Sequence, residues 1–208
     1  MANPARSRRP KSNGPDAPIV VVLGGPNGAG KSTAAPRLLK GALGVVEFIN
    51  ADLIARGISP FDPEGAALAA GEVMLQRMDA LAAAGVSFGL ESTLAARSLA
   101  PRLRELVARG YEFHLVFLYL RSADLAVARV ADRVRLGGHN VPENTIRRRY
   151  RAGLTNFFDL YRPIAKSWQM FDNSHAGRME LIAAGTRQRA SRIPQKALWK
   201  KIQREAHS

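Results

Sequence analysis

One segment near the amino terminus combines the residue types that hold a polyphosphate. It reads GPNGAGKS at residues 25–32 and matches the pattern G-x-x-x-x-G-K-[ST]. Glycines let the backbone wrap an anion so that several N–H groups point inward, and a following helix adds its positive N-terminal end. The lysine of such a loop reaches the β- and γ-phosphates, and the next hydroxyl ligates Mg²⁺. We therefore predict an ATP and Mg²⁺ site with Ser32 as the metal ligand. The expected ATP contacts are Gly25, Pro26, Asn27, Gly28, Ala29, Gly30, Lys31, Ser32 and Thr33.

Two acidic residues follow apolar runs farther along the chain. Asp52 comes after residues 45–49, and Glu91 comes directly after residues 86–90. Because α/β proteins bind ligands at the carboxyl ends of their strands, we expect both carboxylates near the phosphate loop. Asp52 can accept the proton of an attacking hydroxyl, or it can be the N-cap of a helix that starts near residue 53. Glu91 can bind the hydroxyls of an acceptor or assist Asp52 through a water, or it can belong to a turn or a capping box.

An arginine-rich stretch follows in the second half of the chain. Arg129 and Arg133 are four residues apart, so they share one face of a helix. The glycine-containing loop GGHNVP at residues 137–142 comes next, and three further arginines occupy residues 147–149. We interpret the stretch as a lid whose guanidinium groups neutralise a transferring phosphoryl group and exclude water. The alternative is a solvated basic helix.

The surrounding sequence alternates between short apolar runs and helical patterns. The runs typical of buried strands cover residues 19–23, 45–49, 86–90, 113–120 and 168–171, and helices are expected at 33–41, 63–84, 99–109 and 124–136. Strands alternating with helices indicate βαβ units with right-handed crossovers. We therefore predict an α/β fold of the P-loop NTPase or kinase type, with a five-stranded, mainly parallel sheet, helices on both faces and an arginine-rich lid.

Composition is that of one globular domain. The 208 residues are 46% hydrophobic and 23% charged, and they contain no cysteine, which excludes disulfides and thiolate metal sites. We expect a disordered basic tail at residues 1–18, a P-loop kinase domain at 19–185, and a basic C-terminal tail, helical in part, at 186–208. No apolar run is long enough to span a membrane, so we expect a cytoplasmic protein with no membrane span.

Residues 19–174 resemble the zeta-toxin-like P-loop kinases. The matching segments are residues 25–32, 48–54, 90–94, 129–142 and 172–174. The resemblance implies phosphorylation of a sugar hydroxyl of UDP-N-acetylglucosamine or a related nucleotide sugar, and an antitoxin protein as partner. It implies that Asp52 is the general base, that Lys31 holds phosphates, and that Arg133 and one of the arginines at 147–149 act from the lid. The residues expected to contact the substrate are Asp52, Glu91, Thr93, Arg129 and Arg148.

The net charge of +14 raises a second hypothesis. The segment 187–208 contains seven basic residues and one acidic residue. Such a basic segment could indicate a polynucleotide kinase or an RNA-associated ATPase. Phosphorylated small substrates account for the arginine-rich stretch without nucleic acid, so we do not expect a nucleic-acid partner. A transporter-type ATPase or a nucleotide switch is disfavoured, because the chain has no LSGGQ signature and no apolar run ending in Asp-Glu.

Overall fold

A computed structural model describes residues 17–138, 140–175 and 177–207. Most of the predicted N-terminal tail, at residues 1–16, and His139 of the predicted lid loop therefore lie outside the described residues. The strands are β1 (Ile19–Gly24), β2 (Glu47–Ile49), β3 (Phe88–Ser92), β4 (Glu112–Tyr119), β5 (Ser167–His175), β6 (Arg178–Thr186) and β7 (Arg189–Arg192). The α-helices are α1 (Lys31–Ala35), α2 (Ala51–Ile58), α3 (Ala67–Ala83), α4 (Leu99–Ala108), α5 (Ala123–Arg135), α6 (Glu143–Asn156) and α7 (Lys196–Glu205). A π-helix, Pro36–Ala42, continues α1, and π-helical and 3₁₀ turns at Phe157–Tyr161 and Arg162–Ile164 follow α6.

The strands within these described ranges form one sheet in the order β2-β3-β1-β4-β5-β6-β7. The first five strands in this order are parallel, whereas β6 and β7 pair antiparallel. The α/β, P-loop type of fold is confirmed. The number of strands was predicted wrongly, because the sheet has seven strands and not five.

The two missed strands are the last two of the sheet, where β6 pairs with β5 and β7 forms the edge. β7 is only four residues long and contains Arg189 and Arg192, both exposed. Short edge strands with charged side chains are common in native sheets because they prevent pairing with other chains. Such a strand has no apolar run, so the pattern that predicted the buried parallel strands could not detect it.

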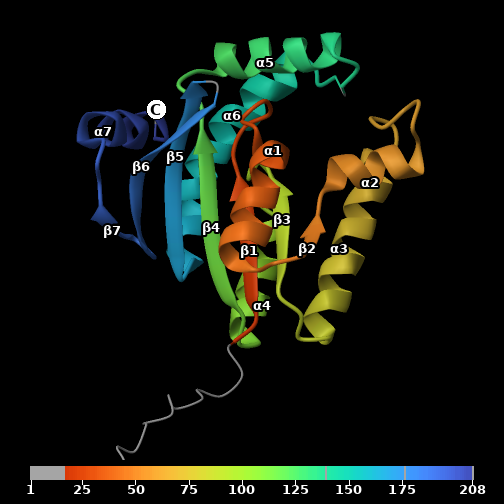
Figure 1. The fold of residues 1–208 in the computed structure, drawn as a ribbon, viewed down its shortest axis with the longest axis horizontal. Helices are drawn as coiled ribbons and strands as arrows, with labels where there is room; N and C mark the ends of the chain where they lie inside the picture. Colours follow the sequence, from red (N-terminus) through yellow and green to blue (C-terminus); the bar gives the residue numbers. More distant parts are fainter. Residues whose placement is uncertain (1–16, 139, 176, 208) are drawn as a thin grey trace, which may run out of the picture.

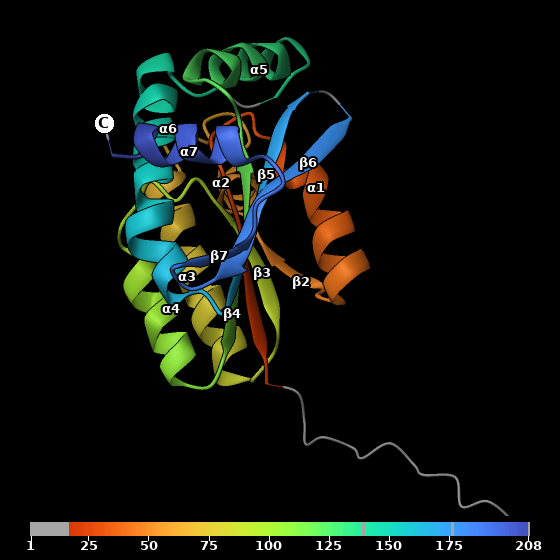
Figure 2. The same cartoon turned by 90° about the vertical axis from the view of Figure 1, so that its left-hand side faces the viewer.

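Helices cover both faces of the sheet, as predicted. Figure 2 shows α1 on one face and α3, α4 and α6 on the other, with the sheet seen nearly edge-on between them. In Figure 1, α5 lies across the end of the sheet close to α1 and α6, which is where the phosphate loop follows β1. α3 ends before Gly85 and α4 before Gly110, both with positive φ, as expected for glycine at the end of a helix.

The C-terminal segment is integrated into the domain. β6 runs through the boundary that was expected between residues 185 and 186, and α7 packs on the core. The ring of Trp199 is stacked on Trp168 with the ring centroids 5.4 Å apart, and Ile202 is fully buried beside it. The predicted division into a domain and a tail therefore does not coincide with a break in the fold, because the apolar side of α7 completes the core.

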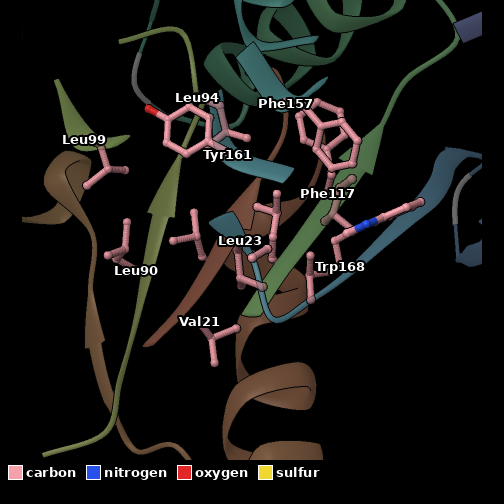
Figure 3. Close-up of a cluster of buried hydrophobic side chains, with 14 of the residues drawn as sticks. Val21, Leu23, Leu90, Leu94, Leu99, Phe117, Phe157, Tyr161 and Trp168 are labelled. Atoms are coloured by element: carbon pink, nitrogen blue, oxygen red, sulfur yellow. The ribbon is translucent and has the colours of Figure 1, made fainter. Parts of the chain in front are cut away.

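The core lies on both sides of the parallel strands. Figure 3 shows part of it, in which Leu23 and Leu90 come from the strands while Phe157 and Tyr161 come from the turn after α6. Phe117 packs against Phe157 with ring centroids 5.1 Å apart. Within the described residues, none of the helices has both the length and the apolar character that crossing a membrane requires.

Candidate active site

The phosphate loop connects the end of β1 to the start of α1, as the sequence predicted. Gly25, Gly28 and Gly30 have positive φ values of 140°, 76° and 79°. A Cβ at Gly25 would lie 2.4 Å from the carbonyl oxygen of Leu118, so any side chain would push the loop away from β4. Gly30 is the N-cap of α1 and has no side chain to bond the helix start, which leaves the first N–H groups of α1 available to an anion.

Lys31 is buried inside this loop. Its Nζ donates to the carbonyl oxygens of Gly25 and Pro26 at 2.9 and 3.0 Å and lies 3.9 Å from a carboxylate oxygen of Glu91. Burial lowers the pKa of Lys31, and the nearby positive charges of Arg133 and Arg149 lower it further, against the opposing effect of the two carboxylates, Glu91 and Asp52. The charged form of Lys31 is therefore disfavoured by the surrounding protein. A bound polyphosphate would stabilise this charged form through its negative charge.

Ser32, Asn50 and Glu91 form a hydrogen-bonded group beside the lysine. The Ser32 hydroxyl donates to Glu91 Oε2 at 2.8 Å, and the Asn50 amide donates to the same oxygen at 3.0 Å. The parallel register places Leu23 opposite Glu91 and Ile49 opposite Leu90, so three strand ends bring these residues together. The donor set fits Mg²⁺, which prefers oxygen ligands and takes few from the protein when it also binds phosphates. Ser32 would hold the ion and Glu91 would orient the hydroxyl.

Asp52 lies in the first turn of α2, and its carboxylate is exposed. The N-cap of this helix is Asn50, whose side-chain oxygen accepts hydrogen bonds from the backbone N–H groups of Asp52 and Leu53 at 2.9 and 3.1 Å. The capping role that was the alternative for Asp52 is therefore filled by its neighbour. Among the described residues, the Asp52 side chain has no hydrogen-bond or ion-pair partner, and it lines the cavity described next.

A cavity of about 590 Å³ opens at these strand ends, a volume typical of small-molecule sites. Five predicted site residues line it together: Lys31, Asp52, Glu91, Thr93 and Arg148. Apart from Glu72, the wall that comes from α3 and the start of α4 is mainly apolar, with Leu68, Gly71, Met74, Leu75 and Leu99. The cavity is thus charged next to the phosphate loop and mainly apolar away from it.

The predicted lid arginines divide into two groups. Arg148 and Arg149 of α6 line the cavity, and neither has a hydrogen-bond or ion-pair partner in the described ranges. Arg133, in the last turn of α5, does not line the cavity, but its positive charge lowers the pKa of Lys31. Arg149 was not singled out from the sequence, because a run of three arginines does not reveal which of them faces the ligand until the helix is placed.

Two further arginines of the stretch, Arg129 and Arg147, bind other parts of the protein. Arg129 donates to the carbonyl oxygens of Asn173 and Ser174, each at 2.8 Å, and to that of Gly28 at 3.5 Å. It therefore joins the phosphate loop to the end of β5 and is not among the residues that line the cavity. Arg147 forms ion pairs with Asp124 and Glu143 and so links α5 to α6.

The end of β5 supports the phosphate loop from the other side. The Asn173 amide donates to the carbonyl oxygen of Ala29 at 2.7 Å, and Asp172 is buried in an ion pair with Arg121 at 2.8 Å. Burial by itself raises the pKa of Asp172, but hydrogen bonds from Ser174 and Arg121 outweigh it and hold the pKa below its ordinary value. The segment 172–174 therefore supports the site from outside the cavity.

Strand order, phosphate loop and flanking helices together define a P-loop kinase fold. Comparison with known proteins identifies the family: the model named Zeta toxin matches residues 4–175, and the chain belongs to this family. An uncharacterized protein of Haemophilus influenzae is 31% identical over 126 residues, which cover 61% of this chain and 88% of that protein.

Two solved structures share the fold at low sequence identity. The crystal structure of AvrRxo1-ORF1:-ORF2 with ATP superposes with a TM-score of 0.68 and 15% identity, over 89% of this chain and 63% of that chain. A structure from the PezAT chromosomal toxin-antitoxin system of Streptococcus pneumoniae gives a TM-score of 0.60 and 16% identity, over 91% of this chain and 86% of that one. The chain spans less than two thirds of the AvrRxo1 chain that it resembles.

Proposed function

We propose that this protein transfers the γ-phosphoryl group of ATP to a hydroxyl of a small molecule. The single observation that carries the proposal is that Lys31, buried in the phosphate loop, and Asp52, an exposed carboxylate without a partner among the described residues, line the same cavity. The family membership and the ATP complex of the AvrRxo1 protein support ATP as the donor. No basic residue of the segment 187–204 lines this cavity, so a polynucleotide substrate is not favoured.

The residues of the site then divide the steps of the transfer among them. The loop amides and Lys31 hold the β- and γ-phosphates, and Asp52 takes the proton of the acceptor hydroxyl as its oxygen attacks the γ-phosphorus. The new P–O bond forms while the bond to the β-phosphate oxygen breaks, and ADP leaves. Arg148, Arg149 and Arg133 stabilise the negative charge on the transferring group. Mg²⁺ would be held by the Ser32 hydroxyl, which Glu91 orients, and would neutralise phosphate charge when bound.

We propose a nucleotide sugar, with UDP-N-acetylglucosamine as the leading candidate, as the acceptor. The family membership motivates this choice, and the cavity is compatible with it. The two arginines at the charged end can pair with phosphates of the acceptor, while the apolar wall of α3 can cover a base or a sugar ring. The roles of Glu91 and Thr93 in contacting the acceptor also belong to this proposal.

We further propose a cytoplasmic protein that is controlled by an antitoxin partner. The support comes from the similar structures, since one belongs to a toxin-antitoxin system and the other is a complex of two gene products. Co-expression with the product of a neighbouring gene, followed by purification through a tag on one partner, tests this directly.

The decisive experiment uses ATP labelled at the γ-phosphate, Mg²⁺ and a panel of nucleotide sugars. We expect the purified protein to label one of them and Asp52→Asn to lower kcat by about 10²- to 10⁴-fold, as for loss of a general base. ATP affinity should stay within about twofold, because Asp52 does not hold phosphate. Glu64→Gln, an exposed acidic residue outside the cavity, is the matched control. Full transfer activity in Asp52→Asn would refute the assignment of the base.

A further inference from the structure

The loop after β3 has an unusual backbone. Ser92, Thr93, Ala95 and Ala96 line the cavity, while Leu94 between them points into the core and is fully buried. Leu94 has a φ of +59°, in the left-handed region that residues other than glycine adopt only at a cost in free energy. Residues held this way persist only where the surrounding contacts outweigh that cost, and they concentrate at functional sites.

Contacts on the sheet side hold part of this loop, which we define as the 92–96 loop. The backbone N–H of Leu94 donates to the Ser92 hydroxyl at 3.0 Å. The Leu94 side chain packs against Gly24, where a Cβ would lie 2.9 Å from its Cδ1 atom. The loop is therefore seated against the residue that precedes the phosphate loop.

The remaining contacts come from α6 and the turn after it. The Asn156 side-chain amide donates to the carbonyl oxygens of Leu94 and Ala95 at 2.8 and 3.2 Å, and the Tyr161 hydroxyl donates to that of Ala96. Three successive carbonyl groups of the loop are thus bound. Asn156 and Tyr161 are both buried, and Leu94 and Tyr161 belong to the cluster shown in Figure 3.

Close packing adds to these hydrogen bonds. A Cβ at Gly153 of α6 would lie 2.3 Å from the carbonyl oxygen of Thr93, so the helix backbone touches the loop directly. The same helix carries Arg148, Arg149 and Ala152, which line the cavity. One rigid element therefore presents the arginines to the phosphates and also fixes the loop on the acceptor side.

We propose that Asn156 is a positioning residue for the phosphoryl acceptor, acting through the 92–96 loop. It lines no part of the cavity itself. By holding the Leu94 and Ala95 carbonyl groups it sets where Ser92 and Thr93 meet the acceptor, relative to the arginines of α6. The inference rests on the proposed function. It predicts that loss of the Asn156 hydrogen bonds weakens binding of the acceptor and leaves binding of ATP unchanged.

The test compares Asn156→Leu, which keeps the size of the side chain and removes both donated hydrogen bonds, with Thr155→Val. Thr155 is the adjacent residue of α6, and its hydroxyl bonds to Ala206 of the C-terminal segment instead of the loop. We expect Asn156→Leu to raise the KM for UDP-N-acetylglucosamine about tenfold, the equivalent of one to two hydrogen bonds, and to leave the Kd of ATP within about twofold. Thr155→Val should leave both values near those of the wild type.

A second measurement does not depend on the identity of the acceptor. Hydrogen exchange in a peptide covering residues 92–99 should be about tenfold faster in Asn156→Leu than in the wild type, whereas a peptide covering residues 25–32 should exchange at the same rate in both. Unchanged exchange at 92–99, an unchanged acceptor KM, or an equal loss of ATP and acceptor binding would overturn the proposal. If the wild type transfers to no nucleotide sugar, the proposed acceptor fails, and the exchange result still decides whether Asn156 holds the loop.

Discussion

Replacing Trp199 with alanine tests whether α7 is part of the folded domain. Trp199 is 4% exposed, and its indole ring stacks on Trp168. The distance between the centroids of the Trp199 and Phe158 rings is 5.3 Å. Truncating a buried aromatic side chain to alanine costs about 3–5 kcal/mol, which includes the loss of the stacked pair. For a domain of this size, each kcal/mol lowers Tm by about 2–4 °C. We therefore expect a decrease in Tm of roughly 6–20 °C.

Differential scanning calorimetry with Lys200→Ala as the control measures this effect. Lys200 is the next residue of α7 and is exposed, so its replacement should change stability by less than about 0.5 kcal/mol. The two variants differ in burial but share the helix, which separates core packing from helix propensity. A Tm for Trp199→Ala within about 2 °C of the wild type would refute the packing of α7 on the core and restore the interpretation of a separate tail.

Two further predictions concern charged groups. Arg149→Ala should lower kcat by about 10³-fold, the lower end of what an arginine that stabilises a transferring phosphoryl group contributes. Arg147→Ala removes exposed ion pairs only and should leave steady-state kinetics within about twofold. Equal effects of the two variants would contradict the division of the lid arginines. In the folded state the pKa of Asp172 lies below its ordinary value of 3.8. Its ionised form therefore stabilises the fold above about pH 3.8, and this contribution is lost as the pH falls through the folded pKa. Thermal melts should accordingly show Asp172→Asn less stable than the wild type at pH 7, with a difference that narrows below about pH 3.8; a constant difference would disprove the coupling.

The parallel part of the fold could be predicted because its strands are buried on both faces. Val20, Val21 and Val22 are fully buried, and such strands appear in the sequence as continuous apolar runs. The edge strand β7 could not be predicted in the same way, because it is four residues long and has no apolar run, whereas the short apolar run of β6 at residues 181–184 was not recognised as a strand. The basic residues after position 186 likewise suggested a tail, since the two buried residues of α7, Trp199 and Ile202, are few among many charges.

The amino-acid sequence by itself determined the phosphate loop and the acidic residues at the strand ends. These features depend on local spacing: a glycine-rich turn between a strand and a helix, and a carboxylate just after an apolar run. Lys31, Asp52 and Glu91 could therefore be selected before their distances were known.

Only the tertiary structure decided how the remaining polar residues are used. Asn50 caps α2 and leaves Asp52 free of that role, and Ser32 is bonded to Glu91 from a strand that is distant in the sequence. Arg129 and Arg147 bind the protein, whereas Arg148 and Arg149 face the cavity. The physical reason is that a side chain's partner depends on the packing of α5 and α6 over the sheet. That packing arises from contacts between distant segments, which no local pattern contains.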